Sequence, residues 1–216
     1  MLKEKQGDLD GCEALLMQAL ESDANHPDAV HAYLQVRHGR VGDAGYVEEV
    51  EKLMALDGAW RAHMFRARLH LAKDEDEQAA ALYRRVFERE EVLSDSMVMA
   101  SNDLLQASKT ALLEDLILAR FVPGTHHPQT GIALLHNYRV KQDHVAGEAL
   151  LHEMHLHYAH AIGNELQPFT AEFDRMRLAA LPPPPAPPEN PQVDVLRLDR
   201  PVWYAGLGDP MWLLPP

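Results

Sequence analysis

The stretch HEMHLHYAH, residues 152–160, places four histidines and a glutamate in nine positions. Imidazole and carboxylate groups at helical spacing can bind a divalent metal, and H-E-x-x-H is the zinc-protease motif. That motif needs histidines at i and i+4, so that both face one metal ion. Leu156 stands four residues after His152, so the stretch does not carry the motif.

A helix through this region turns by about 100° per residue and therefore puts the histidines on two flanks of an apolar stripe. One flank forms a ladder of candidate metal ligands: His144, Glu148, His152 and His155. His, Glu and His at i, i+4 and i+8 can chelate a transition metal weakly. The alternative is a solvated or helix–helix polar flank, because structural sites use four ligands and supporting hydrogen bonds.

No other pattern in the sequence predicts an enzyme. The chain has no phosphate-binding loop, dinucleotide fingerprint or G-x-S-x-G nucleophile turn. Cys12, its one cysteine, lies on an apolar helical face, which indicates a packing thiol rather than a nucleophile. We therefore expect a non-catalytic protein without a cofactor. The alternative is a metal-binding regulator or an enzyme that uses the histidine-rich region.

The charge of the chain limits its partners. Its 216 residues carry 33 acidic and 20 basic side chains, a formal net charge of −13. Nucleic acids and anionic membranes both attract clustered lysine and arginine, so neither is an expected partner. No apolar run approaches the length of a membrane span, and the start of the chain does not have the pattern of a signal peptide. We expect a cytoplasmic protein.

The histidine-rich helix belongs to an internal repeat. Small and apolar residues recur at i, i+4 and i+7, which is one face of a helix. Such triplets begin at positions 12, 46, 79, 112 and 147, in steps of 34, 33, 33 and 35 residues. The triplets are Cys12, Leu16, Ala19; Tyr46, Val50, Leu53; Ala79, Tyr83, Val86; Leu112, Leu116, Ala119; and Gly147, Leu151, Met154.

A second set of helical stretches and a set of turn residues recur with the same period as the triplets. Helical stretches at 28–40, 59–72, 95–108 and 129–140 precede the last four triplets. Short polar residues that can cap backbone N–H groups stand ahead of four triplet helices. These are Asp8, Asp43, Asp74 and Asp143. The unit is therefore helix, turn, helix, in about 34 residues.

This unit resembles the tetratricopeptide repeat, a helical hairpin with a period of about 34 residues. In the third copy, Ala67, Ala79 and Tyr83 match the family's small, small and aromatic positions. Val86 stands where the family has alanine, and His63 holds the position of the family's tryptophan. The alternative is a generic array of helical hairpins without kinship to the family.

The resemblance implies an all-α fold, a right-handed superhelical solenoid of about four to five hairpins over residues 1–165. Residues 166–181 are expected to form a capping helix. The proline-rich stretch 182–191 predicts a polyproline II linker, and 192–216 a short irregular aromatic tail with a weak strand signal. Because only MLKEK precedes the first turn, we expect either a fragment of a longer chain or an open first hairpin.

The resemblance also implies a ligand groove along the first helix of each hairpin. Its polar positions fall on His31, Gln35, His38, Arg61, Arg68, Ser101, His136 and Arg139. The implied groove carries three arginines and three histidines but only one acid, Asp28. This balance favours an acidic ligand, because guanidinium groups bind carboxylates through paired donors. We therefore expect a non-catalytic scaffold that binds an acidic peptide segment or a C-terminal carboxylate of another protein.

Overall fold

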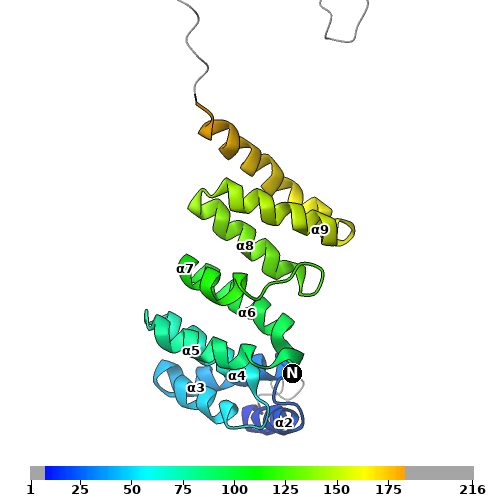
Figure 1. Ribbon diagram of the computed structural model, residues 1–216. Coiled ribbons are helices and arrows are strands. Elements are labelled where there is room, and N and C mark those ends of the chain that lie inside the picture. The colour runs from blue at the N-terminus through cyan, green and yellow to red at the C-terminus, as the bar shows by residue number, and fades with distance from the viewer. Residues whose placement is uncertain (1–7, 183–216) are drawn as a thin grey trace, which may run out of the picture. The chain divides into compact units, whose positions relative to one another are not determined.

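The computed structural model describes residues 8–182, and within them the regular structure is entirely helical. The prediction of an all-α fold is confirmed for this part of the chain. In chain order the elements are α2 (Leu9–Ser22), α3 (Pro27–Met54), α4 (Trp60–Leu71), α5 (Asp76–Phe87), the 3-10 turn η1 (Glu90–Val92), α6 (Leu93–Gln106), α7 (Thr110–Leu113), the π-helical segment η2 (Glu114–Leu118), α8 (Pro128–Lys141) and α9 (His144–Ala180) (Figure 1).

The described helices α2 to α9 all belong to one compact unit, which ends at Ala180. The predictions for residues 1–7, for the proline-rich linker beyond Pro182 and for the aromatic tail 192–216 lie outside the described residues.

The predicted helix pairs lie where the repeat places them. α4 and α5 form one hairpin, and α8 packs against α9. α3 contains both helices of an earlier hairpin, because Gly42 interrupts it with a φ of 63° and a ψ of −171°. Each hairpin packs on the next, since α4 contacts both α3 and α6, and α6 contacts α8. The helices consequently succeed one another in chain order along the unit (Figure 1).

Three turns between paired helices share one backbone geometry. Asp74, Ser108 and Gln142 each have a φ of 58°. At each turn, the N–H of this residue and that of the next residue bond to carbonyls three and five residues earlier. This is the Schellman arrangement, which satisfies carbonyls at a helix end and usually has glycine at the left-handed position. The repeat in the sequence is thus also a repeat of backbone geometry.

Two of the four predicted caps are confirmed. The side chains of Asp8 and Asp143 accept a hydrogen bond from the N–H three residues later, at 2.8 and 3.1 Å. The other two predictions are wrong. Asp74 itself takes the left-handed turn position and pairs with a lysine, and Asp43 bonds across its turn to His38.

Replacing Ser108 with glycine is expected to stabilise the protein by about 0.5–1 kcal/mol. Ser108 is exposed, and a left-handed conformation costs a residue with a Cβ roughly 1–2 kcal/mol, partly offset by the greater unfolded-chain entropy of glycine. Urea unfolding followed by circular dichroism measures the change. The control is Ala72→Gly, at the exposed and right-handed end of α4, which should destabilise instead. A loss of stability in Ser108→Gly would contradict the assignment of the turn.

The predicted apolar triplets form the core in the third and fifth copies. Their central residues, Tyr83 and Leu151, are 0% and 5% exposed. The fourth copy departs from the prediction, because the π-helical turn η2 adds a residue to the helical turn and rotates the face that packs. The predicted central residue Leu116 is fully buried there together with Leu113 and Ile117, whereas Ala119, which was expected to pack, is exposed.

α9 folds back on itself. Its backbone leaves the helical range at Ile162, with a φ of −133° and a ψ of 21°. Glu148 and Arg177, far apart in the sequence, form an ion pair of 3.4 Å, so the segment after Ile162 returns along the segment before it (Figure 1). This returning segment is the predicted capping helix. It begins after Ile162 rather than at 166, and it includes Pro168.

Candidate functional site

Four of the eight predicted groove residues line one open pocket between α3 and α4, named here the α3–α4 pocket. Its volume is about 440 Å³. His31, Gln35 and His38 come from the first half of α3, and Arg68 comes from α4. The rest of the lining consists of Leu34, Asp43, Tyr46, Phe65 and Leu69. Four of the predicted groove residues therefore lie together at one concave site, in which polar groups stand beside apolar side chains.

His38 joins the two halves of α3 at the edge of this pocket. Its Nε2 lies 2.6 Å from Oδ1 of Asp43, on the far side of the turn at Gly42. The ring of Tyr46 meets the imidazole edge to face, with centroids 5.2 Å apart. Burial raises the pKa of Tyr46, so the phenol stays neutral and can donate a hydrogen bond. The contacts of His38 fix its ring at the mouth of the pocket.

Arg68 is only partly available to a ligand, because it binds an acid from the next hairpin. Its Nε and Nη2 lie 2.8 and 2.7 Å from Oδ1 of Asp103 on α6. The side chain of Asp103 is 2% exposed and also accepts a hydrogen bond of 3.3 Å from Tyr83. Burial raises the pKa of Asp103, and the guanidinium of Arg68 opposes that rise. The charge of Arg68 is therefore largely balanced inside the protein.

Arg61 and Ser101, two other predicted groove residues, make contacts within the helices. The guanidinium of Arg61 lies 4.4 Å from the ring centroid of Trp60, and its Nη1 lies 3.2 Å from Sδ of Met99. Burial lowers the pKa of Arg61. The hydroxyl of Ser101 is buried and donates to the carbonyl of Met97 at 2.6 Å. Ser101 is a packing residue, so its prediction as a ligand contact is wrong.

The predicted groove residues of the fifth copy lie against the returning part of α9. His136 meets Phe169 edge to face at 4.8 Å, and Arg139 forms an ion pair of 3.5 Å with Glu172. Burial is the main cause that lowers the pKa of His136, and Arg139 adds to it. These two side chains therefore bind the chain's own capping helix at the place where a ligand was expected.

The histidine ladder does not assemble into a metal centre. Glu148 pairs with Arg177 at 3.4 Å, and His152 is exposed. Across residues 8–182, no three His, Cys, Asp or Glu side chains are placed to hold a metal ion. The prediction of His144, Glu148, His152 and His155 as metal ligands is consequently not supported by the geometry, because an arginine occupies the one carboxylate of the ladder.

Tyr158, not a histidine, makes the long-range polar contacts from the HEMHLHYAH stretch. Its hydroxyl accepts a hydrogen bond from the N–H of Gly124 and donates one to the carbonyl of His126, both at 2.6 Å. His157 lies at the same loop, where a Cβ on Gly124 would come within 2.6 Å of its Nδ1. The stretch therefore anchors the loop before α8.

No protein-family model, curated protein or solved structure matches this chain. The kinship with the tetratricopeptide repeat therefore stays a prediction. Among the described helices, none has the length and apolar character needed to cross a membrane.

Proposed function

We propose that this protein is a non-catalytic scaffold that binds a peptide segment of another protein in the α3–α4 pocket. Four side chains predicted for a ligand groove converge on this one pocket of about 440 Å³, and that convergence carries the proposal. The proposal includes a right-handed solenoid of tetratricopeptide-like hairpins. The repeated turns and the packing of each hairpin on the next support that architecture.

The pocket offers what an extended peptide needs. A peptide main chain presents both donors and acceptors, and the amide of Gln35 and the imidazole of His31 can serve either. Phe65 and Leu69 supply apolar surface beside them. Such a mixture of apolar surface and a few polar groups is usual for ligand sites.

The pocket has fewer cationic groups free to bind an acidic ligand than the sequence predicts. Asp103 balances Arg68, so the guanidinium keeps mainly its Nη1 for a ligand. Two of the three arginines predicted for the groove are paired with acids of the chain itself. We therefore propose a segment with one carboxylate directed at Arg68, next to an apolar side chain, rather than a run of acids.

Replacing His38 with glutamate is expected to weaken binding of such a segment about tenfold, or about 1.4 kcal/mol. The change removes a possible donor and adds a second negative charge beside Asp43 at the mouth of the pocket. Peptides selected from a displayed random library on the wild-type protein serve as probes, and fluorescence anisotropy gives their Kd.

The matched control is His152→Glu, which makes the same change on an exposed histidine of α9. It should leave the Kd unchanged. The proposal is overturned if no selected peptide distinguishes His38→Glu from His152→Glu.

A further inference from the structure

The first apolar triplet is less covered than its counterparts. The central residue of the triplet is 0% exposed at Val50 and Tyr83 and 5% exposed at Leu151. The equivalent Leu16 is only half-buried, and Ala19, the last residue of its triplet, is exposed. α2 therefore keeps an apolar face that the described helices do not fully cover.

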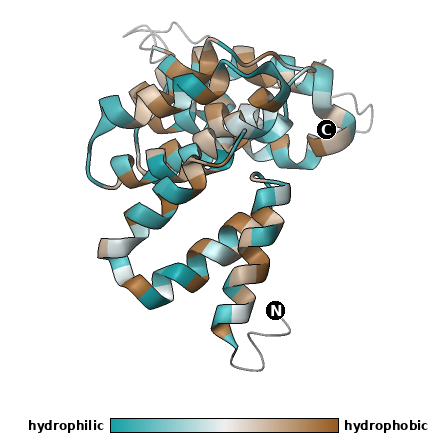
Figure 2. Cartoon of the chain, turned by 90° about the horizontal axis from the view of Figure 1, so that it is seen from below, coloured by the Kyte–Doolittle hydropathy of each residue, from teal (hydrophilic) through white to brown (hydrophobic). Residues whose placement is uncertain are grey.

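A groove lies beside this face, between α2 and the first turns of α3, and is named here the α2–α3 groove. Its volume is about 450 Å³. Its apolar lining comes from both helices and consists of Cys12, Leu16, Ala29, Ala32 and Val36. Leu9 and Leu15 on α2 are 41% and 52% exposed. Figure 2 shows hydrophobic residues along the helix next to the N label.

The packing of the third hairpin indicates what shape fits this groove. There α4 lies against both α5 and α6. In the repeat, α2 corresponds to α5, and the first half of α3 corresponds to α6. The place that α4 holds on α5 and α6 therefore corresponds to the α2–α3 groove. Among the described helices, α3 is the one that α2 packs against substantially. An α-helix with one apolar face has the shape that completes this arrangement.

The charge around the groove indicates which charged residues the polar face of that helix should carry. Residues 8–28 contain six acidic side chains and neither lysine nor arginine. Asp10 and Glu13 are paired with arginines of α3. Asp28 is exposed, and it is the one Asp, Glu, Lys or Arg among the residues that line the groove. A cationic flank on the occupant matches the exposed carboxylate of Asp28, because complementary charges favour and orient association.

We propose that the α2–α3 groove binds an amphipathic helix with lysine or arginine flanks from a partner protein, in the position that α4 holds on α5 and α6. This site is separate from the α3–α4 pocket in its apolar lining and its ligand. His31 and Gln35 form the ridge between the two sites, because both residues line both cavities.

The probe is an amidated, fluorescein-labelled peptide of roughly 14 residues, about four helical turns, with leucine at i, i+3, i+4 and i+7 and lysine on both flanks. Saturable anisotropy binding is expected with the wild-type protein. A scrambled peptide of equal composition, which has no apolar stripe, should bind at least about tenfold more weakly, and so should a peptide with glutamate flanks.

Ala32→Arg places a long cation in the groove and is expected to weaken binding at least about tenfold. Ala14→Arg is the matched control, because Ala14 lies on α2 beside Asp10 and Glu13 rather than in the groove. Asp28→Lys reverses the rim charge at an exposed position and should weaken binding without a packing change. Circular dichroism and urea unfolding establish that each variant is folded.

Cys12 gives a second readout, because it is the single cysteine of the chain, lines the groove and is only 4% exposed, so its alkylation reports how readily the structure opens beside the groove. Bound peptide should slow its alkylation by iodoacetamide several-fold. Equal binding by Ala32→Arg and Ala14→Arg, or unchanged alkylation, overturns the proposal. The proposal is also overturned if the protein self-associates and Ala32→Arg abolishes that self-association, since the occupant would then be a second copy of this chain. His38→Glu should not affect this peptide, so failure here is distinguishable from failure of the α3–α4 pocket.

Discussion

Replacement of Arg37 with methionine is expected to lower the free energy of unfolding by about 3 kcal/mol. Methionine keeps much of the side-chain volume but removes the guanidinium that lies 2.6 Å from Oε1 of Glu49. The side chain of Glu49 is 3% exposed. Removing one partner of a buried ion pair strands the other charge away from water, which typically costs about 3–5 kcal/mol. Urea unfolding at neutral pH measures the loss.

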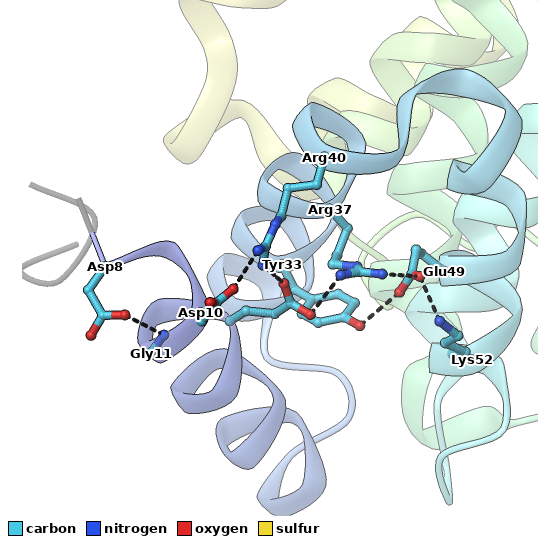
Figure 3. A network of polar contacts seen from close by, with 9 residues as sticks. Asp8, Asp10, Gly11, Tyr33, Arg37, Arg40, Glu49 and Lys52 are labelled. Atoms are coloured by element: carbon cyan, nitrogen blue, oxygen red, sulfur yellow. Dashed lines mark hydrogen bonds and ion pairs between the residues drawn. The ribbon is translucent and has the colours of Figure 1, made fainter.

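The cost falls at the lower part of this range because Glu49 keeps other partners. Lys52 lies 2.6 Å away, and the hydroxyl of Tyr33 donates to Oε2 at 2.9 Å. Arg37 also bonds to Glu13 on α2 at 2.9 Å, so the same guanidinium joins α2 to both halves of α3 (Figure 3). The network therefore holds α2 to the hairpin that α3 forms.

The same network gives stability a particular pH dependence. Burial pushes the pKa of Glu49 upward, but the hydrogen bonds from Arg37, Lys52 and Tyr33 outweigh it and lower the pKa from 4.5 to about 2. A carboxyl whose pKa is depressed by folding stabilises the protein above the unfolded value and loses that effect as pH falls toward the folded value. For Glu49 the contribution is about 3 kcal/mol, lost between pH 4.5 and about 2.

Two controls distinguish the loss of the buried ion pair from the general effect of removing one positive charge. Arg84→Met removes an arginine whose pair with Asp115 is exposed on both sides, so it should cost no more than about 0.5 kcal/mol. The double variant Arg37→Met, Glu49→Met should recover about half of the loss, since it leaves no buried charge. An Arg37→Met variant as stable as Arg84→Met would show that the network does not hold α2 to the hairpin of α3.

Local features of the fold were predictable from the sequence because they depend on spacing along one helix. The triplet at Ala79, Tyr83 and Val86 is buried, as a period of 3.6 residues requires. The helix pairs were predictable from the same period together with the turn residues. Asp8 and Asp143 act as caps through contacts that span only three residues. Such contacts need no knowledge of the neighbouring hairpin.

The electrostatics of the groove were not predictable in the same way, because they depend on side chains from neighbouring hairpins. Arg68 lies on the expected helix face, yet its partner is Asp103 on α6. Since α4 and α6 occupy equivalent places in successive repeats, an acid about one repeat after an arginine is a signal that could have found this pair. Glu172 also follows Arg139 by about one repeat, so the same signal covers this pair, although here the acid reaches the arginine through the reversal of α9.

Substitution of Gly147 with alanine is expected to destabilise the returning part of α9 by about 2 kcal/mol. A Cβ at this position would come within 2.4 Å of two carbons of the Phe173 ring. Phe173 is 1% exposed, so its ring cannot move aside without losing packing. Overpacking costs about 1–3 kcal/mol, and two contacts of 2.4 Å against a buried ring place this site at the upper end. The better helix propensity of alanine offsets about 1 kcal/mol of that cost. Hydrogen exchange across residues 163–180 measures the local loss.

Gly163→Ala is the matched control in the same helix. A Cβ there meets nothing within 4 Å, so this variant should be equally stable or more stable than the wild type. In Gly147→Ala, partial release of the returning segment also removes Phe169 from His136. Because burial lowers the pKa of His136, its release should raise that pKa toward 6.5, which NMR titration detects. Two results together would contradict this prediction: hydrogen exchange in Gly147→Ala that equals exchange in Gly163→Ala, and an unchanged pKa of His136. Gly147 would then not determine how α9 covers the fifth copy.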